Sequence, residues 1–268
     1  MENGKIVHSV AKSMQLLDIL NEAPQPLPLS ELSARTGLAK STIHGLLSTM
    51  KAFSVVAQDA EGNYTLGIRL FEYGCSLQSS WRIVEIARPY IDALSQHTGE
   101  AIFLSTMDHG DIITLDHADN KRGFGISAEI GRRLPMHCTS EGKLFLAYLP
   151  DDDRETILQK KEWKAYTSRT ISSRRELDQE LARIRKQGYA TEQSEYKIGL
   201  RSVAAPILNA KGSIQYAIGL ICMNRQLETR LFEQDIQVVL ESAAKISEQL
   251  RAAAPNRPDT ADPDPTVK

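Results

Sequence analysis

Residues 31–51, ELSARTGLAKSTIHGLLSTMK, hold the pattern that most constrains what this chain can fold into. Ser30 can cap a first short helix, and Gly37 supplies a turn directly after it. A second helix starts at Lys40, and its apolar residues are spaced to share one face: Ile43, Leu46, Leu47 and Met50. The stretch therefore predicts two short helices that meet at a tight turn.

The opposite face of the second helix is polar. Its residues carry hydroxyl, basic or imidazole groups: Lys40, Ser41, Thr42, His44, Ser48 and Thr49. Such a face suits a helix in a DNA major groove, where hydroxyls and a cation contact phosphate oxygens and side chains near the helix start reach base edges. A bundle corner with a glycine turn is the alternative explanation. We predict DNA contacts for five of these residues: Lys40, Ser41, Thr42, His44 and Ser48.

The neighbouring segments favour the DNA-reading interpretation. Before the pair, an additional helix has four apolar residues spaced for one face: Val10, Met14, Leu17 and Leu20. After the pair, two short β-prone runs flank a turn at residues 61–63. Three helices followed by a hairpin predict a winged helix-turn-helix domain over residues 1–67.

Three stretches in this part carry a family resemblance: SVAKSMQLLDIL, LSELSARTGLAKSTIHGLLSTM and YTLGIRLFEYG. They resemble the N-terminal domain of the IclR family of bacterial transcription regulators, and the likeness extends over roughly residues 8 to 250. Two positions depart from the family pattern. Gly45 stands where the family usually has Arg in the recognition helix, and Ser54 stands where it usually has Gly in the turn before the wing.

Length and charge limit how such a domain can work. With 268 residues the chain suits a small head of about 75 residues and a larger second domain. Residues 1–80 carry six Lys or Arg against seven Asp or Glu, so attraction to DNA that is independent of sequence should be modest. Affinity then depends on the placement of Lys40 and Lys51 and on linking several heads in an oligomer.

The three cysteines, Cys75, Cys138 and Cys222, are far apart and lack CxxC or metal-ligand spacing. They predict neither a disulfide framework nor a metal site. No apolar run approaches the roughly 18 residues of a membrane span, and the first residues lack a signal-peptide pattern. We therefore expect a soluble protein of the reducing cytoplasm, without a membrane partner and without a cofactor.

The rest of the chain changes from helical to strand-like periodicity several times. Residues 68–80 predict a linker helix, residues 81–252 an α+β domain, and the Pro-rich acidic residues 253–268 a disordered tail. Helices of the α+β domain are expected over 82–98, 140–149, 151–158, 173–187 and 230–251. Its strands are expected over 101–107, 111–117, 123–130, 203–208 and 213–223.

Two stretches of this domain, LPMHCTSEGKLFLA and EYKIGLRSVAAPI, resemble the signatures of the IclR effector domain, whose fold is related to GAF domains. In that family small organic acids or aromatic compounds bind between the sheet and these loops. Thr139, Ser140 and the backbone N–H groups that follow them can bind an anion at a helix start. Matched position by position, the resemblance implies effector contacts for Ser140, Glu141, Glu192, Ser202, Gly219 and Ile221.

Three of these positions depart from the family pattern. Gly219 and Ile221 stand where the family often has Ser, and Glu141 stands where a small or apolar residue is expected. The pocket should then be less polar, and an inward Glu141 would repel an anion, so we expect a ligand larger or more apolar than a glyoxylate-like acid. Structural roles are the alternative: Ser140 as an N-cap, Glu141 as an exposed first-turn acid, Ser202 as a strand-edge hydroxyl, and Gly219 as a packing accommodation.

A thiol-dependent redox enzyme is the alternative from a different functional class. His137 adjoins Cys138, and Cys222 could act as a resolving thiol. Adjacent residues of an extended segment point to opposite faces, however, which separates the imidazole from the thiol. The sequence also lacks a Gly-rich phosphate loop and a nucleophile elbow. We therefore predict that the chain is not an enzyme.

These observations together predict a DNA-binding transcription regulator of a catabolic operon, with repression as the commoner family mode. Its partners would be double-stranded operator DNA, a small organic effector and a second copy of itself. The effector would be a sugar acid, an organic acid or an aromatic compound. The resemblance implies a homodimer that can pair into a dimer of dimers.

Overall fold

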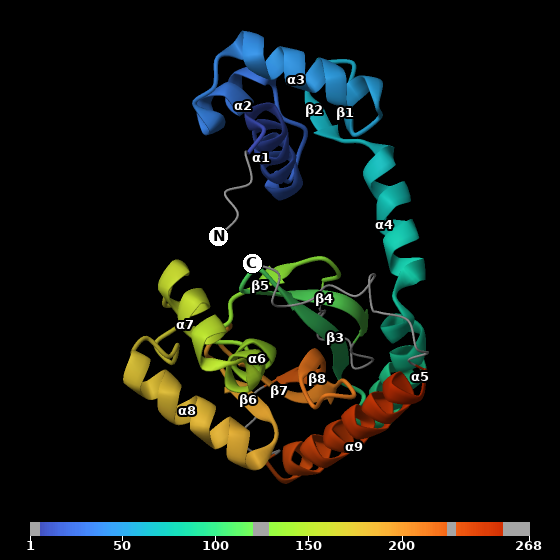
Figure 1. The fold of residues 1–268 in the computed structure, drawn as a ribbon, viewed down its shortest axis with the longest axis vertical. Coiled ribbons are helices and arrows are strands. Elements are labelled where there is room, and N and C mark those ends of the chain that lie inside the picture. Colours follow the sequence, from blue (N-terminus) through green and yellow to red (C-terminus); the bar gives the residue numbers. More distant parts are fainter. Residues whose placement is uncertain (1–5, 120–128, 224–228, 254–268) are drawn as a thin grey trace. The chain divides into compact units, whose positions relative to one another are not determined.

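The computed structural model describes residues 6–119, 129–223 and 229–253 of the chain. Contacts divide the chain into an N-terminal unit, residues 1–80, and a C-terminal unit, residues 81–268. The N-terminal unit contains three helices, a hairpin and a further helix (Figure 1), namely α1 His8–Glu22, α2 Leu29–Thr36, α3 Lys40–Ala52, β1 Val56–Gln58, β2 Tyr64–Leu66 and α4 Ile68–Ser80. The predicted order of helices and hairpin is confirmed.

The core of the N-terminal unit lies between the three helices and the hairpin, and its buried residues are Leu16, Leu20, Leu27, Leu32, Ile43, Leu47, Met50, Val56 and Tyr64. The predicted apolar face of α3 is confirmed, with Leu46 partly buried. The predicted face of α1 is right in part: Leu20 is buried and Leu17 packs against this core, whereas Val10 and Met14 are 60% and 53% exposed. This helix has apolar residues on two sides, and Leu16 and Leu20 occupy the side that the other helices cover.

The turn between α2 and α3 forms as the sequence predicts, because Gly37 ends α2 in the left-handed region at φ 69°. Ser30 does not cap α2, which is a second correction. The helix starts at Leu29, one residue earlier, and Pro28 stands at the N-cap without a side-chain hydrogen bond. An antiparallel bridge between Leu27 and Tyr64 holds this part of the chain in place before the helix begins.

The hairpin, β1 and β2, turns at Gly62, which has φ 89°. Asp59 closes the turn by accepting hydrogen bonds from the backbone N–H (2.7 Å) and the side-chain amide (3.2 Å) of Asn63. Before the hairpin, Ser54 has φ 58°, which is the left-handed conformation that glycine adopts without strain. The departure from glycine at this position therefore strains the backbone of this turn.

The C-terminal unit is built on a six-stranded antiparallel sheet with the strand order β5-β4-β3-β8-β7-β6. The strands are β3 Ala101–Asp108, β4 Asp111–Ala118, β5 Arg133–Leu134, β6 Ala190–Gln193, β7 Leu200–Leu208 and β8 Ile214–Met223. Four of them confirm predicted strands, whereas β5 and β6 were missed because β5 has only two residues and β6 is short and polar. The predicted strand at 123–130 falls outside the described residues except for its last two positions, which are not in a strand.

Helices cover both faces of this sheet (Figure 1). On one face, α5 Arg82–Thr98 and α9 Thr229–Ala253 pack against alternate residues such as Leu104, Val203 and Leu220. Towards the other face lie α6 Ser140–Tyr148, α7 Asp151–Lys160 and α8 Arg174–Gln187. These helices confirm the predicted ones. The predicted tail at 253–268 lies outside the described residues after Ala253.

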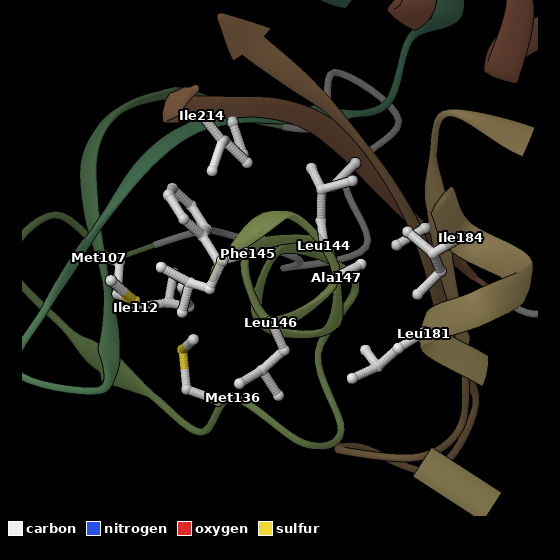
Figure 2. Close-up of a cluster of buried hydrophobic side chains, with 14 of the residues drawn as sticks. Met107, Ile112, Met136, Leu144, Phe145, Leu146, Ala147, Leu181, Ile184 and Ile214 are labelled. Carbon is white, nitrogen blue, oxygen red and sulfur yellow. The ribbon is translucent and has the colours of Figure 1, made fainter. Parts of the chain in front are cut away.

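Helix α6 is buried on every side. All of its residues from Ser140 to Ala147 are buried, and Figure 2 shows its apolar side chains pointing in different directions into the cluster. Phe145 lies on the side of Ile214 and Met107, and Leu146 points between Met136 and Leu181. Because the helix is enclosed, its two charged residues, Glu141 and Lys143, are drawn into the interior.

Candidate functional site

The outer face of α3 has the composition that the sequence predicts and is open to solvent. Each of the five predicted DNA-contacting residues is exposed: Lys40, Ser41, Thr42, His44 and Ser48. Lys40, Ser41 and Thr42 form the first turn of the helix, and Ala39 at the N-cap makes no side-chain hydrogen bond to it. The first backbone N–H groups of α3 therefore have no side-chain cap and point along the helix axis at its start, where such groups can bind a phosphate.

Two further features belong to the same surface. Lys51, in the last turn of α3, donates to the side-chain oxygen of Gln58 on β1 at 2.8 Å, which joins the helix to the hairpin. Gly45 is exposed in the middle of α3, and a Cβ added there would meet no atom within 4 Å. Its lack of a side chain therefore reflects no packing requirement within the described residues.

In the C-terminal unit the structure gathers four of the predicted effector residues at the start of α6. The Ser202 hydroxyl donates to Ser140 Oγ at 2.8 Å, and the Ser140 hydroxyl donates to Glu141 Oε2 at 2.9 Å. Glu192 lies opposite Ser202 in the β6–β7 register. We call these four residues the α6 cluster: Ser140, Glu141, Glu192 and Ser202. All four are at most 5% exposed.

The structural roles expected for these residues are wrong in three cases. Thr139, not Ser140, is the N-cap of α6, because its Oγ1 accepts the Gly142 backbone N–H at 3.1 Å. Glu141 is 3% exposed and is not a surface acid. Ser202 lies in β7, which pairs on both sides and is not a sheet edge.

Burial of these carboxyl groups changes their acidity. Burial raises the pKa of Glu192 to about 7. Hydrogen bonds from the backbone N–H groups of Tyr196 and Glu195 lower this pKa but only partly offset the effect of burial. Burial likewise raises the pKa of Glu141. The α6 cluster therefore presents hydroxyls beside two acid groups, of which Glu192 is partly in the neutral form near pH 7, and the negative charge of its carboxylates disfavours a small anion.

The charged neighbours of the α6 cluster were missed by sequence reasoning. Lys143 Nζ contacts Glu195 Oε1 at 2.6 Å and Glu180 Oε1 at 3.2 Å, although the lysine side chain is only 1% exposed. The signal was present in the stretch GKLFLA, where a lysine stands next to a long apolar run. Gly142 is needed beside it, since a Cβ there would lie 2.4 Å from the backbone oxygen of Met136.

The last two predicted effector residues, Gly219 and Ile221, lie on β8 and share one face of the sheet with each other. Ile221 pairs with Ser202 in the β7–β8 register and is partly buried next to the core. Gly219 pairs with Phe103, and a Cβ at Gly219 would lie 2.3 Å from Phe103 Cζ and 2.2 Å from the Val203 backbone oxygen. The phenyl ring thus occupies the space that a serine hydroxyl would need.

The two buried cysteines do not form a thiol site. Cys222 packs in the core with α5 and α9, whereas Cys138 lies beside the α6 cluster on the other side of the sheet. Burial raises the pKa of the Cys138 thiol to about 12 and that of Cys222 to about 11, so neither forms the reactive thiolate at neutral pH. The described residues hold no group of His, Cys, Asp or Glu that could bind a metal ion. Among them there is also no helix able to cross a membrane.

A winged helix with an open polar face on α3, followed by a domain of mixed helices and strands, defines a DNA-binding transcription regulator of two domains. Residues 9–60 match the IclR helix-turn-helix domain, and residues 75–248 match the bacterial transcriptional regulator IclR C-terminal domain. The chain therefore belongs to the IclR family of transcriptional regulators, which are not enzymes.

Known proteins support this assignment over most of the chain. It is 32% identical to the HTH-type transcriptional regulator XynR of Escherichia coli over 83% of this chain and 89% of XynR. It is 34% identical to the Transcriptional repressor IclR of Escherichia coli over 76% of this chain and 75% of that repressor. A solved structure of an IclR homologue from Microbacterium hydrocarbonoxydans, complexed with 4-hydroxybenzoate, shares the fold with a TM-score of 0.78. That match has 23% identity and covers 91% of this chain and 100% of the homologue.

Proposed function

We propose that this regulator is a repressor of a catabolic operon and that a small organic effector controls its affinity for the operator. The open polar face of α3 in a winged helix carries the proposal, because such a face reads the major groove in proteins of this architecture. Lys40 and Thr42 would contact phosphates, and Ser41 and His44 would contact bases or phosphates. Ser48, one turn further along, would contact the flanking backbone.

We further propose that the effector binds at the start of α6, against the α6 cluster together with Thr139, Gly219 and Ile221. The gathering of buried hydroxyl and carboxyl groups at one point supports this position, since such groups recognise the polar part of a ligand. The acid groups favour an effector that donates hydrogen bonds over a compact anion. The homologue that was crystallised with 4-hydroxybenzoate makes an aromatic hydroxyl compound a reasonable first candidate.

A homodimer is part of the proposal. Helix α4 has no buried residue, and its large apolar side chains are exposed: Ile68, Phe71, Tyr73 and Leu77. Val10 and Met14 of α1 are exposed as well. A second head covering these residues would place two recognition helices on two half-sites, and paired dimers would add further heads. Effector binding would then shift the arrangement of the paired heads, with a coupling of typically about 1 to 3 kcal/mol.

DNA binding is tested with fragments from upstream of the protein's own gene across a salt series. The variant Lys40→Ala/Thr42→Ala/His44→Ala should lose specific binding and should show a salt slope lower by about 1 to 2, because phosphate contacts are removed. The matched control, Lys186→Ala/Thr156→Ala/His97→Ala, changes the same residue types at exposed positions of the C-terminal unit and should bind as the unmodified protein does. Equal loss in both variants, or no fragment preference at low salt, would contradict the proposal.

A further inference from the structure

A cavity of about 330 Å³ lies in the C-terminal unit, on the outer side of the segment that leads into α6. Its lining comes from the turn before β4, from β5 and the following residues 135–137, from the end of α7 with residues 161–166, and from Tyr196. None of the α6 cluster residues lines it. Sequence reasoning did not find this cavity, because its walls come from segments that are up to 86 residues apart, from Gly110 to Tyr196.

Aromatic rings form one wall of the cavity. The rings of His137 and Trp163 are stacked, with centroids 6.0 Å apart and planes 18° apart, and the Tyr166 ring lies 6.2 Å from His137. Tyr196 meets Tyr166 edge to face at 4.9 Å. Planar π-faces gathered in this way favour a flat, unsaturated ring as occupant, and Leu134, Ile157 and Leu158 add apolar surface.

The rest of the lining carries three basic residues, Arg133, Lys161 and Lys164, against Asp111 and Glu162. Arg133 pairs with Asp108 at 2.7 Å and with Asp111 at 3.4 Å, and Lys161 pairs with Asp111 at 2.7 Å. Lys164 makes no ion pair with the described residues, and its ammonium lies 5.5 Å from the centroid of the Tyr166 ring. A carboxylate on the occupant could therefore pair with Lys164 while its ring lies against the aromatic wall.

Hydrogen bonds hold the wall in place before any ligand arrives. His137 Nε2 lies 3.0 Å from the Lys164 backbone oxygen, and Trp163 Nε1 donates to the Leu158 backbone oxygen at 3.2 Å. The Thr170 hydroxyl accepts the Tyr166 backbone N–H at 3.0 Å and donates to the Glu195 backbone oxygen at 2.6 Å. A site whose groups are fixed in advance loses little conformational entropy on binding.

The protonation of His137 follows from its partner. A backbone oxygen only accepts, so Nε2 carries the proton and Nδ1 of the neutral ring is an acceptor. Burial lowers the pKa of His137, which keeps the ring uncharged at neutral pH. The cation that faces an anionic occupant is therefore Lys164 and not the imidazole.

We propose that this cavity is a second ligand site, separate from the α6 cluster, and that it binds a monocyclic aromatic carboxylate through the His137–Trp163–Tyr166 wall and the ammonium of Lys164. The site adjoins the start of α6, because Thr139, two residues after His137, ties Pro135 to the first turn of that helix. The inference goes beyond the proposed function, since it requires neither DNA binding nor occupancy of the α6 cluster.

The test uses the intrinsic fluorescence of Trp163. The chain has two tryptophans, so Trp81→Phe leaves Trp163 as the only one, in a full-length protein that otherwise keeps its structure. Benzoate should change this fluorescence in a saturable way. Benzamide, which lacks the charge, and cyclohexanecarboxylate, which lacks the aromatic ring, should each bind about tenfold more weakly or worse.

Variants in the Trp81→Phe background locate the site. Lys164→Gln should weaken benzoate about tenfold, whereas Lys160→Gln, an exposed lysine of α7 outside the lining, should not change it. Ser202→Ala, in the proposed effector site, tests whether the benzoate signal comes from that site instead. Absence of saturable binding, equal affinity in Lys164→Gln, or weakening by Ser202→Ala alone would overturn the proposal. No DNA is present in this titration, so its result is independent of the operator-binding experiment.

Discussion

Gly219 shows how a single residue sets the packing inside the C-terminal unit. A Cβ at this position would lie within 2.3 Å of Phe103 and of the Val203 backbone. We predict that Gly219→Ser lowers the free energy of unfolding by at least about 2 kcal/mol, because a clash with a backbone oxygen cannot be relieved by side-chain rotation. Urea unfolding followed by circular dichroism measures this change.

Gly74→Ser supplies the control for that experiment. Gly74 is exposed in α4, and a Cβ there meets nothing within 4 Å, so the same substitution should change stability by less than about 0.5 kcal/mol. A Gly219→Ser protein as stable as the control would show that Phe103 moves aside and that this position of β8 can hold a hydroxyl.

Glu192 makes the stability of the protein depend on pH. Its pKa in the folded protein is about 7, above the ordinary value of 4.5, so between these values the folded state binds more protons than the unfolded state. Stability should therefore fall as pH rises from 5 to 8, by up to about 3 kcal/mol. Glu192→Gln should flatten this dependence in urea titrations, whereas the exposed Glu248→Gln should not. An unchanged slope in Glu192→Gln would contradict the raised pKa.

At the scale of the element, α3 combines a well-defined buried face with a destabilising glycine, Gly45, at its centre. Gly45 lowers helix stability without any packing reason, since nothing lies within 4 Å of its missing Cβ. We predict that Gly45→Ala stabilises the protein by about 1 kcal/mol, which a thermal unfolding curve records as a rise in Tm. Operator affinity should be kept. Loss of affinity in a more stable protein would instead mean that DNA approaches the backbone at Gly45.

Helix α1 shows that hydrophobic periodicity alone does not identify which face of a helix is buried. Val10 and Met14 fit a helical face as well as Leu16 and Leu20 do, yet only the second pair is buried. The choice depends on which side α2 and α3 cover, and that contact is not encoded in the local spacing. Helix α8 is the opposite case, because the Ser173 cap and Gly188 mark its ends in the sequence and in the structure alike.

At the scale of the whole molecule, α4 carries the prediction on assembly. Phe71 is 68% exposed on a helix without a buried residue. If this surface pairs two heads, Phe71→Ser should weaken the dimer and lower operator affinity at least tenfold while leaving the thermal stability of the monomer nearly unchanged. Sedimentation equilibrium and operator titration measure the two effects. A fully monomeric wild type, or a variant with unchanged association, would contradict the proposal.

By itself the sequence determined the order of the helices and of the four long strands, the polar face of α3 and the family resemblance, because turns, caps and periodicity are local properties. It also brought Ser140, Glu141, Glu192 and Ser202 together, but only through the family resemblance. The tertiary structure alone decided that Glu141 and Lys143 are buried, because α6 is enclosed on all sides. It alone decided that Phe103 fills the space at Gly219 and that distant segments enclose an aromatic, basic cavity, because such contacts join residues far apart in the chain.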